Sequence, residues 1–368
     1  MKPLRIVIAG GGTGGHLYPG IAVARELQRR YAAAEVTFAG TARGMEARVI
    51  PREGFQLDLL RSTGLKGMSP GALVRGLLLL PLSGLDAWTI LSRRRPDLVI
   101  GVGGYSSGPV VMAAAVRGIP TLLLEQNAVP GLTNRLLARF VSAAAVAFES
   151  TREYFGRRAF VTGNPVRPEF FDAAPVGASN GTPGILIIGG SQGAHAINVA
   201  MVEAAPRLAA HPGRMAVTHQ TGERDLDFVR DGYRRAGLEA RVEPFLFTMD
   251  DEMKRADLVV SRAGATTLAE LTAAGAPALL IPLPTAADDH QRKNAEVLVA
   301  GGAAEMIEQQ DLTGAGLADR IVGLLSNAAR LHAMSDAARR FARPDAARAI
   351  VDKALQLTGA EGRSGGSD

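Results

Sequence analysis

Short, mostly apolar runs alternate along the chain with longer runs in which apolar residues recur at helical spacing. The short runs fall into two series, at residues 4–9, 35–39, 98–102, 121–124 and 143–147, and at 184–188, 215–218, 258–260 and 278–281. Runs of this kind are typical of parallel strands that are buried on both faces. The pattern therefore predicts an α/β protein with two Rossmann-like, doubly wound parallel-sheet domains.

A stretch rich in proline and glycine, at residues 164–168 and 172–184, separates the two series and is predicted to be a linker. At 368 residues the chain also exceeds what one hydrophobic core usually supports. We expect an N-terminal domain at 1–163, a C-terminal domain at 164–342, a helix at 343–358 that crosses back to the first domain, and a disordered tail at 359–368.

The most informative motif is GGGTGGH, Gly10 to His16, directly after the first strand. A strand, a tight turn and a helix in this order aim backbone N–H groups at an anion. The positive end of a helix disfavours a charged imidazole, so His16 is a candidate general base. The motif also matches the GxGxxG turn of dinucleotide-dependent oxidoreductases. Their second strand ends in a carboxylate, however, whereas this one ends in Gly40-Thr41, which argues against that alternative.

The second series opens in the same way, because residues 188–194 mirror residues 9–15. Two equivalent glycine turns predict a ligand held in a cleft between the domains. Farther along, Ala265 and Thr266 begin a helix where a phosphate is favoured, and Glu270 follows one turn later to accept from ribose hydroxyls. Ordinary helix capping by Thr266 or Thr267 is the alternative.

Polar residues follow several other strands. Tyr105, Glu125 and Asn127 should reach the same sheet edge as His16, where they could bind a second substrate opposite the nucleotide. Glu125 could equally be a solvated loop carboxylate. The cluster at 288–294 lies at the end of another strand, but its adjacent Asp-Asp-His residues cannot easily face one ion, so no metal site is predicted.

Composition and charge exclude or disfavour several classes of function. The chain has 41 basic and 36 acidic residues, a net charge of +5 that favours anionic partners. It has no cysteine, which excludes disulfides and thiolate sites and suggests a reducing cytoplasmic setting. Because the first strand is predicted to begin at residue 4, we expect no secretory signal. The uncharged stretch 98–116 has a glycine-rich middle unlike that of a membrane span. With 5% aromatic residues and no known module, a nucleic-acid binder is disfavoured.

Together the motifs resemble one family over residues 6–357, the N-acetylglucosaminyltransferases of peptidoglycan synthesis known as the MurG family. Seven segments carry the resemblance in family order: GGTGGHLYPGIAVA (11–24), GVGGYSSGP (101–109), LEQNAVPGLTNRLLA (124–138), TGNPVR (162–167), GGSQGAHAIN (189–198), SRAGATTLAEL (261–271) and DDHQRKNA (288–295). The resemblance implies a metal-independent, inverting GT-B glycosyltransferase without a cofactor. A GT-B enzyme that uses another lipid or aglycone acceptor is the alternative, and the segment at 124–138 favours the MurG family.

The resemblance also implies the substrates and their residues. UDP-GlcNAc would be the donor, and lipid I, undecaprenyl-pyrophosphoryl-MurNAc-pentapeptide, the acceptor that becomes lipid II. His16 would be the base, with Glu125 and Asn127 orienting the acceptor or sharing the role, and His16, Tyr105 and Glu125 binding it. The implied donor-binding residues are Thr13, Gly14, Gly15, Asn127, Arg167, Ser191, Gln192, Gly193, Leu246 near uracil, Ala265, Thr266, Glu270 and Gln291.

A leucine-rich helix with basic flanks suggests contact with an anionic membrane leaflet. The residues that would make this contact are Lys66, Arg75, Leu77, Leu78, Trp88 and Arg93. Packing of the leucines into the N-terminal core is the alternative. We expect a peripheral protein at the cytoplasmic face of the inner membrane, with cell-wall synthesis complexes as possible partners.

Overall fold

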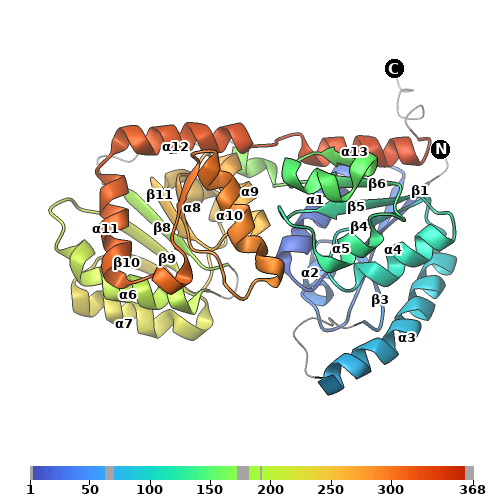
Figure 1. Cartoon of the computed structure of the whole chain (residues 1–368), viewed down its shortest axis with the longest axis horizontal. Coiled ribbons are helices and arrows are strands. Elements are labelled where there is room, and N and C mark those ends of the chain that lie inside the picture. The colour runs from blue at the N-terminus through green and yellow to red at the C-terminus, as the bar shows by residue number, and fades with distance from the viewer. Residues whose placement is uncertain (1–2, 63–69, 172–181, 191–192, 361–368) are drawn as a thin grey trace. The chain divides into compact units, whose positions relative to one another are not determined.

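The computed structural model describes residues 3–62, 70–171, 182–190 and 193–360, with no description of the side chains of 70–78. Two compact units divide the chain (Figure 1): Met1–Val166 with Asp345–Asp368, and Arg167–Pro344. Each unit is built on one parallel sheet, so the predicted α/β class with two doubly wound sheets is confirmed. Of the predicted features, Lys66, Ser191, Gln192, most of the 172–184 linker and the tail beyond residue 360 lie outside the described residues.

The first sheet has seven strands in the order β3-β2-β1-β4-β5-β6-β7. The strands are β1 (Leu4–Ala9), β2 (Ala34–Gly40), β3 (Gln56–Leu59), β4 (Leu98–Gly101), β5 (Thr121–Glu125), β6 (Ala143–Val146) and β7 (Ala159–Val161). The helices are α1 (Gly14–Arg30), α2 (Glu46–Arg52), α3 (Pro70–Arg94), α4 (Ser107–Val116), α5 (Leu132–Leu137) and α13 (Ala346–Leu357), with short 3₁₀ turns η1 (Glu149–Tyr154) and η2 (Gly156–Arg158).

Helices cover both faces of this sheet. On one face, α1 and α13 pack over Leu4, Ile6 and Ile8 of β1, and Ile350, Val351 and Leu355 of α13 join that core. On the other face, Leu91 of α3 and Val111 of α4 pack against Val7 and Val99. Burial on both sides explains why the central strands are almost entirely apolar.

The second sheet has six strands in the order β10-β9-β8-β11-β12-β13. They are β8 (Gly184–Ile188), β9 (Ala216–Gln220), β10 (Ala240–Glu243), β11 (Leu258–Ser261), β12 (Ala278–Leu280) and β13 (Ala304–Met306). Its helices are α6 (His195–Ala209), α7 (Leu226–Ala236), α8 (Met249–Arg255), α9 (Ala265–Ala274), α10 (His290–Ala300), α11 (Gly314–Leu325) and α12 (Ala328–Phe341), with 3₁₀ turns η3 (Pro168–Phe171), η4 (Glu223–Asp225), η5 (Ala287–Asp289) and η6 (Gln309–Asp311).

The hydrophobic pattern did not predict four of the strands, β3, β7, β10 and β13. They stand at the four edges of the two sheets. An edge strand is paired on one side only and is more exposed, so it does not need a continuous apolar run. Their sequences, QLDL, AFV, ARVE and AEM, are short or contain charged residues.

Strand order reverses between β1 and β4 in the first sheet and between β8 and β11 in the second. At such a switch point neighbouring loops diverge beyond the carboxyl ends of the strands, which creates a place for a ligand. The glycine turns after β1 and β8 therefore lie where ligands bind in open α/β sheets.

Candidate active site

The first glycine turn leads directly from β1 into α1. Thr13 is the N-cap residue of α1, and His16 lies in the first helical turn, as the sequence predicts. The Thr13 Oγ1 and His16 Nδ1 atoms are 3.2 Å apart, so the hydroxyl can fix the orientation of the imidazole. The ring of Tyr105 borders the same turn, because a Cβ added at Gly12 would lie 3.4 Å from it. The structure thus brings Thr13, His16 and Tyr105 together.

A buried carboxylate, which the sequence did not reveal, holds this turn in place. Glu46 at the start of α2 is fully buried, and its carboxylate accepts hydrogen bonds from Gly12 N at 2.8 Å and Thr41 N at 2.9 Å. The Thr41 hydroxyl donates a third, at 2.9 Å. The carboxylate missing from the end of β2 is therefore supplied from α2, but it binds the protein's own N–H groups rather than ribose. This arrangement does not support the dinucleotide alternative.

The glycine turn after β4 makes room for His16. A Cβ added at Gly103 would lie 2.8 Å from His16 Cδ2 and 3.1 Å from Nε2. Gly103 also has a φ of +92°, a conformation that other residues rarely adopt. Gly103 of the GVGG motif thus leaves the space that the His16 imidazole occupies.

We predict that Gly103→Ala lowers kcat by about 10- to 100-fold, because a displacement near 1 Å of a reacting group has that order of effect. The dissociation constant of the sugar-nucleotide donor should stay unchanged. Gly118→Ala is the matched control: its φ is also positive, at +70°, but no atom lies within 4 Å of the added Cβ. Equal losses of kcat in the two variants would show that backbone strain, not contact with His16, causes the effect.

Glu125 does not have the exposed position expected of a base or an acceptor-binding group. Its carboxylate is buried and accepts from Asn127 N, Asn127 Nδ2, Gly131 N and Asn134 Nδ2 at 2.9–3.2 Å. Burial raises the pKa of Glu125, although these four hydrogen bonds favour its charged form. This burial contradicts the alternative of a solvated loop carboxylate. Glu125 instead holds the loop that presents Asn127, which is half-buried.

In the second unit, the glycine turn after β8 includes Gly190 and Gly193, both with positive φ. The helix that follows begins at His195, after an N-cap at Ala194. Of the three donor-binding residues that the resemblance implies in this turn, Gly193 lies within the described residues, two positions before the helix.

The loop after β11 leads into α9 at Ala265, with Gly264 as the N-cap and no side-chain cap. Thr266 and Thr267 therefore do not serve as N-cap residues, which removes the capping alternative for this helix start. Both lie in the first turn, where backbone N–H groups and the helix dipole favour a phosphate.

Glu270, one turn into α9, lies in the electrostatic field of Arg167 and Asp250. Burial raises its pKa from 4.5 to about 7; the positive charge of Arg167 opposes the rise, and the negative charge of Asp250 adds to it. Arg167 itself stacks over the ring of Phe170 in η3, at 5.1 Å. The η3 turn packs against α9, which places Arg167 beside the helix that carries Glu270.

Gln291 and Leu246 complete the predicted donor residues. The Gln291 Oε1 atom accepts from Leu283 N at 3.0 Å and Ala263 N at 3.3 Å. Because both partners are donors, the amide orientation is fixed, and the Nε2 group remains to donate to a ligand. The backbone N–H of Leu246 donates to Gln220 Oε1 at 3.1 Å. This N–H is therefore occupied within the protein. The uracil ring of a bound nucleotide would meet the Leu246 carbonyl or the following residue instead.

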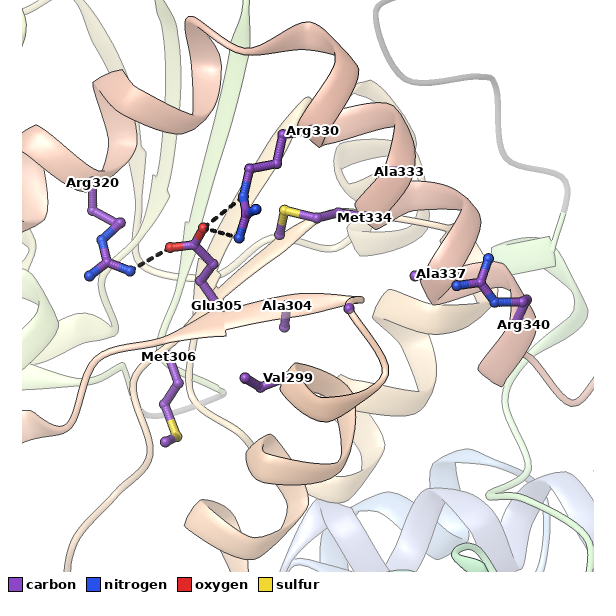
Figure 2. Close-up of a pocket in the computed structure, with 11 residues that line it drawn as sticks. Val299, Ala304, Glu305, Met306, Arg320, Arg330, Ala333, Met334, Ala337 and Arg340 are labelled. Carbon is purple, nitrogen blue, oxygen red and sulfur yellow. Dashed lines mark hydrogen bonds and ion pairs between the residues drawn. The ribbon is translucent and has the colours of Figure 1, made fainter.

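A pocket lies apart from these residues, and no metal-binding group is found among the described ones. A pocket of about 630 Å³ lies beside β13 (Figure 2), where Glu305 is held by Arg320 and Arg330 at its wall. None of the predicted site residues lines it. Among the described residues, no group of three or more His, Asp or Glu side chains is placed to hold a metal ion.

Comparison with known proteins agrees with this geometry. Residues 6–146 match the glycosyltransferase family 28 N-terminal domain, and residues 184–350 match its C-terminal domain. A protein of Anaeromyxobacter sp. strain K, named UDP-N-acetylglucosamine–N-acetylmuramyl-(pentapeptide) pyrophosphoryl-undecaprenol N-acetylglucosamine transferase, is 49% identical over 96% of this chain and 93% of its own. A protein of Syntrophus aciditrophicus with the same name is 47% identical, over 96% and 99%.

The chain belongs to the MurG family. A crystal structure of Acinetobacter baumannii MurG superposes with a TM-score of 0.80 at 31% identity, covering 96% of this chain and all of that one. The resemblance, the GT-B fold and the glycosyltransferase class are thereby confirmed. The chain carries both family 28 domains.

Proposed function

We infer that this chain transfers GlcNAc from UDP-GlcNAc to the C4 hydroxyl of MurNAc in lipid I, which gives lipid II for peptidoglycan synthesis. The observation that carries this inference is the near full-length similarity to relatives named for that reaction. The glycine turns at the switch points of both sheets support it, because two substrates require two sites.

In the donor half, the N-terminus of α9 at Ala265 and Thr266 and the glycine turn at Gly193 would bind the diphosphate. Glu270 would accept from ribose hydroxyls, and the Nε2 group of Gln291 would donate to the sugar or a phosphate oxygen. Arg167 and the helix dipole would stabilise the charge of departing UDP, which is our reason to propose a reaction without an obligatory metal.

In the acceptor half, His16 would take the proton of the C4 hydroxyl as that oxygen attacks the anomeric carbon. The new bond forms as the bond from the anomeric carbon to UDP breaks, so configuration inverts from α to β and UDP leaves with the electron pair. Thr13, Gly14, Gly15, Tyr105 and Asn127 would position the sugars. Glu125 would act through Asn127, as a positioning residue.

The donor half predicts a dependence on pH. UDP-GlcNAc should bind up to about tenfold more tightly near pH 8 than near pH 6, because the Glu270 carboxyl group, with its pKa of about 7, accepts ribose hydrogen bonds most strongly when it is ionised. The diphosphate diester keeps its charge over this range. Calorimetric titration of the wild type and of Glu270→Gln checks this: the variant should bind weakly at both pH values. A variant with the wild-type pH dependence would contradict the role of Glu270.

The assay that tests the proposed function mixes purified protein, a lipid I analogue and radiolabelled UDP-GlcNAc, with and without EDTA. We expect labelled lipid product in both cases and little from UDP-glucose. Intact binding of UDP-GlcNAc without product would point to another acceptor. Failure to bind UDP-GlcNAc would contradict the proposal entirely.

We further propose that the first unit docks on an anionic leaflet at the cytoplasmic face of the membrane. Among the described residues no helix is long and apolar enough to span a bilayer. Exposed apolar side chains nevertheless lie on three neighbouring helices: Leu85 and Trp88 on α3, Val116 on α4, and Leu132 and Leu136 on α5. Arg117 stacks over Trp88 at 4.9 Å, and Arg139 stacks over nearby exposed Phe140 at 5.2 Å. Apolar rings with adjacent guanidinium groups suit a membrane interface.

The predicted membrane residues have mixed outcomes. Trp88 is exposed as required. Arg93 is exposed but forms an ion pair with buried Asp58, so its charge is partly used within the protein. The side chains of Arg75, Leu77 and Leu78 are outside the described part of the chain. Vesicle sedimentation tests the proposal: we expect binding to phosphatidylglycerol vesicles, and equal binding to neutral vesicles would contradict the electrostatic part.

A further inference from the structure

A buried glutamine joins two parts of the proposed donor site. Gln220, the last residue of β9, is 2% exposed. Its Nε2 group donates to the carbonyl oxygen of Gly190 at 2.9 Å, and its Oε1 atom accepts from Leu246 N at 3.1 Å. One side chain thus binds both the glycine turn after β8 and the segment after β10.

The orientation of this amide follows from its partners. A carbonyl can only accept and a backbone N–H can only donate, so Nε2 must face Gly190 and Oε1 must face Leu246. No other uncharged side chain of the same length carries a donor and an acceptor on one planar group. The bridge therefore depends on the amide itself.

Each end of the bridge meets a segment that has backbone hydrogen bonds of its own. The Gly190 carbonyl also accepts from Gly193 N at 2.9 Å, which closes the glycine turn. The segment before Leu246 is tied to the end of β9 by hydrogen bonds from Thr221 N to Glu243 O and from Gly222 N to Pro244 O. Gln220 connects a closed turn to an anchored strand end, and so sets the spacing between them.

A buried network of hydrogen bonds also holds the end of β9 in place. Asn198 on α6 donates to the Thr221 carbonyl at 2.9 Å and contacts His219 Nε2 through its Oδ1 atom at 3.0 Å. His219 Nδ1 lies 2.7 Å from the Tyr233 hydroxyl, and burial lowers the pKa of His219 to about 3. The imidazole is therefore neutral near pH 7, and with Nε2 donating to Asn198 it accepts from Tyr233.

We propose that Gln220 is a positioning residue that keeps the diphosphate-binding turn and the base-binding segment at the spacing required for one nucleoside diphosphate to contact both. This inference rests on the proposed function, in which the second unit binds UDP-GlcNAc. Gln220 itself would act through Gly190 and Leu246 rather than touch the ligand.

Two substitutions separate the ends of the bridge. In Gln220→Glu, the carboxylate can still accept from Leu246 N. It has no N–H to donate to the Gly190 carbonyl, so two acceptor oxygens face each other there. Near pH 8 we expect the affinity for UDP to fall by about tenfold while that for uridine, which lacks the diphosphate, stays within about twofold. Gln220→Met removes both bonds, and both affinities should fall.

The matched control is Ser335→Ala, which removes a buried hydrogen bond from a side chain to the Gly275 carbonyl in the same unit. Its melting temperature should fall about as much as that of the glutamine variants, with UDP affinity unchanged. Calorimetry with UDP and with uridine gives the decisive ratios. A Gln220→Glu variant that loses both ligands by the same factor, or neither, would overturn the positioning role. A wild-type protein that binds no UDP would instead overturn the proposed function on which it rests.

Discussion

Replacing His16 with alanine should lower kcat for GlcNAc transfer by about 100- to 10,000-fold, the usual contribution of a general base. The imidazole lies in the first turn of α1, beside Thr13 Oγ1 and over Gly103. Because the proposed UDP site belongs to the second unit, the dissociation constant of UDP-GlcNAc should change by no more than about twofold.

The pH dependence of kcat separates a base from a merely structural histidine. In the wild type kcat should rise with pH as a single group loses its proton, and in His16→Ala the slow residual reaction should lack that rise. Steady-state assays from about pH 5.5 to 9 would measure both profiles. Retention of more than about a tenth of wild-type kcat, with an unchanged profile, would remove His16 from the role of base.

Replacing Glu46 with alanine should lower the free energy of unfolding of the first unit by about 3 kcal/mol. The substitution leaves three donors, Gly12 N, Thr41 N and the Thr41 hydroxyl, without their acceptor in a fully buried place. Transfer activity should fall as well, because the turn that presents His16 loses its anchor. The chain has one tryptophan, Trp88 in the first unit, so its fluorescence during urea unfolding reports this unit.

Glu53→Ala is the comparison for this prediction. Glu53 lies at the other end of α2 and pairs with exposed Arg25. Exposed pairs contribute about 1 kcal/mol or less, so that variant should unfold almost as the wild type does. Equal destabilisation of the two variants would show that Glu46 has no special part in holding the turn.

The central strands were predictable because burial on both faces requires continuous apolar runs. The glycine turns were predictable because they follow these strands directly. β1 and β8 show this directly. The edge strands β3 and β10 were not predictable from the hydrophobic pattern, because a strand that is paired on one side only tolerates charged residues such as Asp58 and Arg241.

The site was predictable where a residue's position on an element decides its role. His16 follows a glycine turn and Glu270 lies one turn into a helix, and both appear where the sequence placed them. Roles that depend on contacts between distant segments were not predictable. Glu46 and Gln220 have no motif of their own, and their partners Gly12 and Gly190 lie 34 and 30 residues away in the sequence.

The most direct test of the account is to determine the structure of the lipid product made by purified protein from UDP-GlcNAc and a lipid I analogue. Mass spectrometry and NMR of the released disaccharide should show one GlcNAc joined to the C4 oxygen of MurNAc in the β configuration. An α linkage, attachment at another hydroxyl, or no disaccharide despite bound UDP-GlcNAc would contradict it.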